Sequence, residues 1–216
     1  GIDIQVTPKT IIGFVVGGYD SRWNMTAYNN LTIAKNDVTD TVVSIVNTEL
    51  NHWKHFMGNI NFSHKISENE NIAADIDYLY YQDNNPNTYI NKYFNGNGTL
   101  LSEEDTRSGK LTPLSFWVGK IDYTKKLSKK VNAEAGGKIA LSKFTNDVSV
   151  ETLQQNNWVK DPELTTKYNL KENIAAAYAA FSIEASVKTS LKLGLRYEYT
   201  TSNLGSVLQQ NIVDRK

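Results

Sequence analysis

The stretch KTSLKLGLRYEYTTSN, residues 188–203, alternates between apolar and polar side chains along most of its length. One set of alternate positions is apolar: Leu191, Leu193, Leu195, Tyr197 and Tyr199. The positions between them are polar or small: Lys192, Gly194, Arg196 and Glu198. A period of two residues predicts a β-strand with an apolar face and a polar face. The apolar face either packs in a protein core or faces lipid, and that choice determines the class of protein.

Seven other segments show strand-like patterns: residues 1–6, 10–19, 56–65, 71–81, 115–127, 131–141 and 172–183. The beginning of the last one, ENIAAAYAAF, is rich in alanine, which also suits a helix. We interpret it as a strand because it is short and lies directly before the alternating stretch 188–203. The sequence therefore predicts an all-β fold of about seven or eight strands.

The predicted connections have two lengths, which alternate strictly along the chain. The short ones lie near residues 7–9, 66–70, 127–130 and 184–188, and the long ones near 20–51, 82–113 and 143–171. In an antiparallel up-and-down meander, all the long connections then lie at one end of the sheet. This asymmetry, with strands of about ten residues, is typical of a barrel that crosses the outer membrane. We therefore expect residues 1–216 to form one segment of a larger transmembrane β-barrel.

A soluble all-β module is the alternative interpretation. A sandwich of two sheets also has amphipathic strands, but its loop lengths need not alternate. Such a module would bind a ligand or adhere to a partner through its long loops. Charged residues on the second strand face fit both interpretations, because that face meets water in each of them.

The composition argues against several other classes of protein. The chain has 23 basic and 23 acidic residues, so it lacks the positive charge that nucleic-acid binding requires. It has no cysteine for a disulfide framework or a zinc cluster. No apolar run approaches the ~20 residues of a transmembrane helix. Because no catalytic triad, phosphate-binding loop or zinc signature is present, we expect no enzyme activity, no cofactor and no metal.

Charged side chains on the polar strand faces are the candidates for lining a lumen. Asp75 and Asp77 lie on the same face of one predicted strand, about 6.6–6.8 Å apart along it. We interpret them as polar lining and not as catalytic acids, because no other reactive group converges on them. The full set of candidate lumen-facing residues is Asp75, Asp77, Lys120, Asp122, Glu134, Lys138, Lys192, Arg196 and Glu198.

Aromatic residues and histidines provide the other candidates. Those near strand ends predict interfacial girdles in a membrane: Tyr78, Tyr80, Trp117, Tyr123, Tyr178, Tyr197 and Tyr199. Tyr89, Tyr93 and Trp158 lie on predicted loops and are the candidate contacts for an extracellular ligand. The three histidines are His52, His55 and His64, and their spacing matches no metal-binding motif.

The C-terminal part of the chain carries an ordered set of short motifs. Trp158 is followed by Asp-Pro at 161–162 and by ENIAAAY at 172–178, and the next strand carries Gly194, Arg196, Glu198, Thr200 and Ser202. In this order the motifs resemble the outer-membrane β-barrel family of Bacteroidota that is related to TonB-dependent receptors. Upstream segments at 58–81 and 120–147 also look like hairpins of that family, so the similarity covers most of the chain.

The resemblance implies the barrel wall of a receptor or transporter in the bacterial outer membrane. The ligand that it implies is extracellular: a glycan, a peptide or a metal chelate. It also implies contact with outer-membrane lipid and, through a plug domain, with a TonB-type energising complex. Such proteins are several times longer than 216 residues, so we expect this chain to be an excised segment. An isolated segment has two unpaired sheet edges, which favour an edge-paired dimer.

Overall fold

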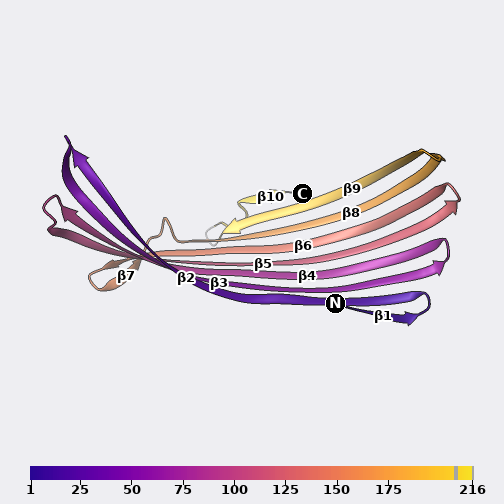
Figure 1. Ribbon diagram of the computed structural model, residues 1–216, viewed down its shortest axis with the longest axis horizontal. Helices are drawn as coiled ribbons and strands as arrows, with labels where there is room; N and C mark the ends of the chain where they lie inside the picture. Colours follow the sequence, from indigo (N-terminus) through magenta and orange to yellow (C-terminus); the bar gives the residue numbers. More distant parts are fainter. Residues whose placement is uncertain (207–208, 216) are drawn as a thin grey trace.

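The computed structural model describes residues 1–206 and 209–215 and places them in one antiparallel sheet (Figure 1). The strands are β1 (Ile2–Thr7), β2 (Thr10–Lys35), β3 (Val38–Ser67), β4 (Glu70–Asn95), β5 (Leu100–Ser128), β6 (Val131–Gln154), β7 (Asn157–Lys160), β8 (Thr166–Ser186), β9 (Thr189–Ser206) and β10 (Val213–Arg215). Their order in the sheet is β1-β2-β3-β4-β5-β6-β8-β9-β10, and β7 pairs with β6 beside that path. None of the described residues belongs to a helix with the length and apolar character that crossing a bilayer requires.

The all-β antiparallel meander predicted from the sequence is confirmed. The eight predicted strands correspond to β1–β6, β8 and β9, and the structure adds the short strands β7 and β10, of four and three residues. Within the described residues the sheet is open, with β1 and β10 at its two edges. Such a sheet is consistent with a segment of a barrel.

The prediction of three long loops is wrong, because nearly all of those residues extend the strands. β2 has 26 residues and β3 has 30. Their pairing runs from the pair Thr10–His64 at one end to the pair Lys35–Val38 at the other. Residues 82–113 likewise lie mostly in β4 and β5, and residues 143–171 mostly in β6, β7 and β8. These extensions are rich in Asn, Thr and Ser, so most of their length lacks the amphipathic period that identifies a strand in a sequence; residues 143–151 of β6, which do alternate, are the exception.

The β2–β3 connection is a two-residue turn. Asn36 and Asp37 both have positive φ, 50° and 60°. A type I′ hairpin turn requires this conformation at both central residues, and Asn and Asp adopt it more readily than most residues. The dipeptide Asn36-Asp37 therefore indicates a hairpin turn at this position of the sequence.

The four turns at the opposite end share one local structure (Figure 1, right). In each turn a backbone N–H donates a hydrogen bond to the Ser or Thr hydroxyl two residues earlier: Lys9 to Thr7 (3.2 Å), Asn69 to Ser67 (3.2 Å), Lys130 to Ser128 (3.2 Å) and Lys188 to Ser186 (3.3 Å). Side-chain hydrogen bonds of this kind stabilise tight turns. We call this the short-turn end of the sheet and the other the projecting end.

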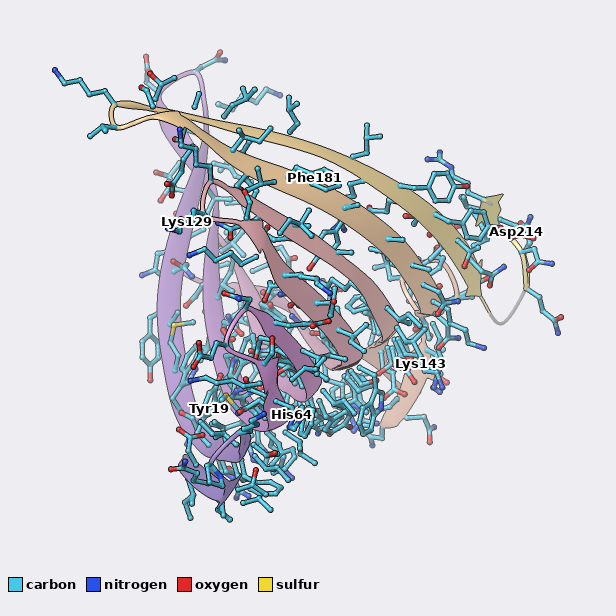
Figure 2. The ribbon with its side chains drawn as sticks, turned by 90° about the vertical axis from the view of Figure 1, so that its right-hand side faces the viewer. Tyr19, His64, Lys129, Lys143, Phe181 and Asp214 are labelled. Carbon is cyan, nitrogen blue, oxygen red and sulfur yellow. The ribbon has the colours of Figure 1, made fainter. Side chains whose placement is uncertain are left out.

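The sheet is curved and its two faces are unequally covered (Figure 2). Residues paired across neighbouring strands share a face, so the register assigns each side chain. Val43, Asn51, Asp83 and Ala176 are buried, and all four lie on the same face. Along residues 170–182 of β8, side chains on that face are buried or half-buried, whereas those on the other face are exposed. We call the crowded face the inner face and the other the outer face.

An apolar belt crosses the outer face beside the short-turn end. It comprises the outer-face residues within 12–18, 56–62, 72–80, 117–123, 131–141, 175–183 and 191–199, which are all aliphatic, aromatic or glycine. Leu195, in the middle of residues 191–199, is 85% exposed. A continuous apolar surface of this size is unfavourable in water. Its length along β9 matches the ~9–11 residues with which a tilted strand crosses a bilayer.

Candidate functional site

The nine candidate lumen residues all lie on the inner face, opposite the belt. Lys120 pairs across the sheet with Asp75 on one side and with Lys138 on the other. Three ion pairs join members of the set: Lys120–Asp122 at 2.5 Å, Lys192–Glu134 at 2.7 Å and Arg196–Glu198 at 2.6 Å. Because these side chains remain partly exposed, each pair contributes only about 0–1 kcal/mol to stability. The arrangement is a group of partly exposed charged side chains on one face of the sheet, several of them joined in ion pairs.

The three histidines lie at separate places. His52 is on the outer face beyond the belt, 2.7 Å from Asp20 Oδ1, and His64 lies at the short-turn end, 2.8 Å from Thr10 Oγ1. His55 is on the inner face, where its ring stacks on Tyr81 with centroids 4.2 Å apart. In the described part of the chain, no three His, Cys, Asp or Glu side chains are grouped so that they could hold a metal ion.

Six of the seven predicted girdle aromatics lie on the outer face, within the apolar belt. Tyr78 and Trp117 contact each other there, with ring centroids 4.7 Å apart. The prediction for Tyr178 is wrong, because this residue pairs with Gly136 and Arg196 on the inner face. The reason is parity: in a regular strand Tyr178 shares a face with Ile174 and Ala176, not with Ala175 and Ala177.

The three candidate ligand contacts are on strands and not on loops, contrary to the prediction. Tyr89 and Tyr93 lie on the inner face of β4, and the Tyr93 hydroxyl donates to Glu104 Oε2 at 3.4 Å. Trp158 lies on β7, opposite Leu153 on the outer side of the sheet. The guanidinium of Arg107 sits over its ring, 4.3 Å from the centroid. The structure therefore does not bring Trp158 together with the two tyrosines.

Titratable groups lie at both margins of the belt on the outer face. At the short-turn margin, the Tyr123 hydroxyl donates a hydrogen bond to Glu70, which holds the pKa of that carboxyl below its ordinary value. At the other margin, the hydrogen bond between His52 and Asp20 likewise lowers the pKa of the Asp20 carboxyl below its ordinary value. Both carboxylates are therefore ionised at neutral pH, where charged groups mark the limits of the apolar band.

A second group of polar residues, which sequence reasoning missed, lies on the inner face of the projecting part. We call it the Asn–Asp cluster; it comprises Glu49, Asn51, Asp83, Asn85, Asn87 and Lys110 from β3, β4 and β5. Its side-chain amides donate along the cluster: Asn85 to Glu49 at 2.5 Å, Asn87 to Asn85 at 2.5 Å and Asn51 to Glu49 at 3.5 Å. Lys110 Nζ is 2.8 Å from Asp83 Oδ2.

The cluster lies where the β3–β4 ladder is interrupted. The pairing stops between Glu49–Asn87 and His52–Asn84, and Pro86, which has no backbone N–H to donate, falls within this gap. One side-chain hydrogen bond, from Asn85 to Glu49, joins the two strands there. The signal available in the sequence was the run DNNPN, residues 83–87, which reads as a loop unless the pairing on both sides is known.

Burial makes the cluster unusual in this open sheet. Asn51 and Asp83 are each only 7% exposed. The Oδ1 atoms of both accept no hydrogen bond from the described residues, and the same holds for Asn47 Oδ1, four residues before Asn51 on β3. Aromatic side chains adjoin the cluster on the same face: Trp53 opposite Asp83, and Tyr81 two residues before it. Hydrogen-bond acceptors beside aromatic rings suit a ligand that carries hydroxyl or N–H donors.

The model of the outer membrane protein beta-barrel family matches residues 64–216, which is well over half of the chain. No curated protein matches the chain. The match covers most of the apolar belt, from β4 to β9, and the belt has the position and composition of a lipid-facing surface. The chain therefore belongs to the outer membrane protein beta-barrel family, and its location is the bacterial outer membrane.

Proposed function

We propose that this chain is part of the barrel wall of a TonB-dependent-type receptor that takes up an extracellular ligand. Three observations support this proposal. The family is one of outer-membrane barrels, the motifs at 158–202 resemble the Bacteroidota branch related to TonB-dependent receptors, and the strands continue far past the belt. In this arrangement the belt meets lipid and the nine charged inner-face residues line the lumen.

The Asn–Asp cluster is the observation that carries the receptor role. Asn51 and Asp83 are buried with side-chain oxygens that accept no hydrogen bond from the described residues, and an acceptor left unpaired in this way destabilises the fold by about 1–3 kcal/mol. Because these oxygens are covered in the structure, a ligand recovers that free energy only where its binding displaces the side chains that cover them. The neighbouring Trp53 and Tyr81 supply flat apolar surface. This chemistry favours a glycan or a peptide over a metal chelate.

The proposal includes the partners of the barrel wall. Outer-membrane lipid surrounds the belt, and the energising complex of the inner membrane acts through the plug of the longer protein. The two sheet edges, at β1 and β10, pair with the other strands of that protein. If the 216 residues are isolated in detergent, the same edges pair with a second copy. The soluble binding module is not retained, since the matched family is one of outer-membrane proteins.

Binding and energised uptake are tested separately on the full-length protein. Intrinsic tryptophan fluorescence is measured against neutral oligosaccharides, short peptides and ferric chelates, with wild type compared with Asn51→Leu. The expected result is a saturable change for one oligosaccharide or peptide class that N51L weakens about tenfold or more. Cells then receive that ligand with and without a protonophore. Uptake that persists when the inner membrane is de-energised contradicts the TonB-type mechanism, and a ligand that binds N51L normally contradicts the site.

A further inference from the structure

Two cavities on the outer face follow one another along β6, β8 and β9. The first is an apolar groove of about 560 Å³ within the belt. Its floor is formed by small residues, including Gly119, Gly137 and Ala175, and its walls by Ile139, Tyr197 and Tyr199. Because the belt faces lipid, a groove in it is open to the hydrocarbon chains of the bilayer.

The second cavity lies beyond the belt, toward the projecting end, and it is polar. It has a volume of about 520 Å³, and the side chains that line its outer-face part are Lys143, Lys171, Thr145, Asn169, Asn203 and Asn211. Lys143 follows Ile139 by four residues on β6, so its backbone is about 13–14 Å from the groove wall. Figure 2 labels Lys143 on β6. The polar cavity is thus at the level of lipid headgroups when the belt spans the hydrocarbon.

The two lysines of the polar cavity are paired with each other across the sheet. The β6–β8 ladder places Asp147 opposite Lys167, Thr145 opposite Asn169, and then Lys143 opposite Lys171. The first pair forms an ion pair at 2.7 Å and the second a hydrogen bond at 2.8 Å. Like charges directly opposite each other destabilise a sheet. Both lysines are exposed, and neither forms an ion pair with any described residue.

We propose that the two cavities together bind one phosphorylated membrane lipid. The phosphate lies between the Nζ groups of Lys143 and Lys171, where it replaces their mutual repulsion with two charge-assisted contacts. The side-chain NH2 group of Asn169, whose Oδ1 accepts from Thr145, is positioned for a further headgroup oxygen, whereas that of Asn203 already donates to Asn211 Oδ1 at 2.8 Å. An acyl chain extends from there into the groove over Gly119, Gly137 and Ala175. The proposal rests on the belt facing lipid and is independent of the uptake of any ligand.

A lipid fits both cavities, whereas simpler occupants fit only one. A free phosphate ion satisfies the lysines but leaves the groove unused. A neutral lipid fills the groove but leaves the like-charge pair uncompensated. The small residues of the floor are the feature that makes the groove, and Gly119 has no atom within 4 Å of the position where a Cβ would be added. A larger side chain at Gly119 therefore fills the groove without a clash, which provides a clean test.

The experiment uses the full-length protein in detergent, titrated with phosphatidylglycerol and followed by native mass spectrometry. Diacylglycerol with the same chains and glycerol phosphate are the two comparison probes. The expected result is that Lys143→Gln and Lys171→Gln each weaken phosphatidylglycerol binding about fivefold, and the double variant about 25-fold. Gly119→Leu is expected to weaken it at least as much as one lysine substitution. Neither comparison probe is expected to bind as tightly as phosphatidylglycerol.

Lys54→Gln is the matched control, because Lys54 lies on the same face just beyond the belt but lines neither cavity. An unchanged affinity in this variant, with losses in the other three, supports the site. An equal loss in Lys54→Gln shows general attraction to a basic surface and overturns the proposal. Tight binding of glycerol phosphate that Gly119→Leu leaves unchanged shows an anion site without a lipid, and equally tight binding of diacylglycerol shows a groove without a headgroup site. Either result also overturns it.

Discussion

Asp83 is a nearly buried carboxylate whose cationic partner is only half-buried. Its side chain is 9% exposed, and that of Lys110 is 47% exposed. Burial disfavours the charged carboxylate, and the ammonium group 2.8 Å away offsets that cost. The Oδ1 atom accepts no hydrogen bond from the described residues. At the scale of single residues, the stability of the Asn–Asp cluster therefore depends on Lys110.

Lys110→Met is expected to destabilise the full-length protein by about 1–3 kcal/mol, because it leaves Asp83 buried without a charged partner. Lys92→Met is the matched variant. It removes an ion pair with Glu103 at 3.3 Å, but both side chains of that pair are nearly half exposed. We expect it to cost only about 0–1 kcal/mol. Urea unfolding in lipid vesicles measures both, and equal losses would contradict the special position of Asp83.

Glu70 predicts a pH dependence with a defined sign. Its pKa is lowered in the folded protein, first by the Tyr123 hydrogen bond, so the bond stabilises the fold above the ordinary pKa of about 4.5. That contribution is lost as the pH falls through the lower folded-state pKa. Tyr123→Phe is therefore expected to destabilise the protein at pH 7, and the difference from wild type is expected to shrink at and below about pH 4.

The matched variant for that test is Tyr80→Phe. The Tyr80 hydroxyl donates to Gln82 Oε1 at 2.7 Å, and this acceptor does not titrate. The destabilisation by Tyr80→Phe should thus be the same at pH 7 and pH 4. The measurement is the free energy of unfolding of wild type and both variants at pH 7 and at pH 4. A pH-independent effect of Tyr123→Phe would refute the role given to Glu70.

At the scale of elements, the sequence predicts the part of each strand that lies in the belt and little beyond it. Residues 191–199 alternate because lipid on one side and water on the other select different side chains. Beyond the belt, water contacts both faces, so residues 24–34 and 84–92 show no period, and their sequence alone predicts loops. The same ambiguity hid Asn51 and Asp83, whose burial depends on strands that are paired but far apart in the sequence.

Leu195→Arg tests which face of β9 meets lipid. Leu195 lies at the middle of the belt, and an arginine at the bilayer midplane of a barrel costs about 2–4 kcal/mol. Thr200→Arg is the matched variant, since Thr200 lies on the inner face of the same strand with Arg196 and Glu198. We expect it to change stability by less than about 0.5 kcal/mol. Unfolding in lipid vesicles compares the two, and a larger effect at Thr200 would reverse the assignment of the faces.

At the scale of the whole molecule, the sheet has two zones with different solvents. The 30 residues of β3 span about 100 Å when extended, whereas a bilayer core is about 30 Å thick. The belt occupies the zone beside the short-turn end, and the β2–β3 and β4–β5 hairpins reach furthest at the other end (Figure 1). Because each zone is held by its own pairings, the projecting zone is separable from membrane insertion.

Shortening the two hairpins distinguishes the Asn–Asp cluster from the tyrosines predicted to bind ligand. Asn24 is paired directly with Leu50, so residues 25–49 are replaceable by an Asn-Gly turn without a change of register. The same replacement of residues 88–107 joins Asn87 to Ser108, which are also paired.

Both shortened proteins are expected to insert into the outer membrane, as judged by heat-modifiable mobility on gels. The first loses Glu49 and should lose ligand binding, whereas the second keeps the cluster and should retain binding although Tyr89 and Tyr93 are gone. Loss of binding in the second protein alone would transfer the site to the tyrosines, and failure of both to insert would contradict the separation of the two zones.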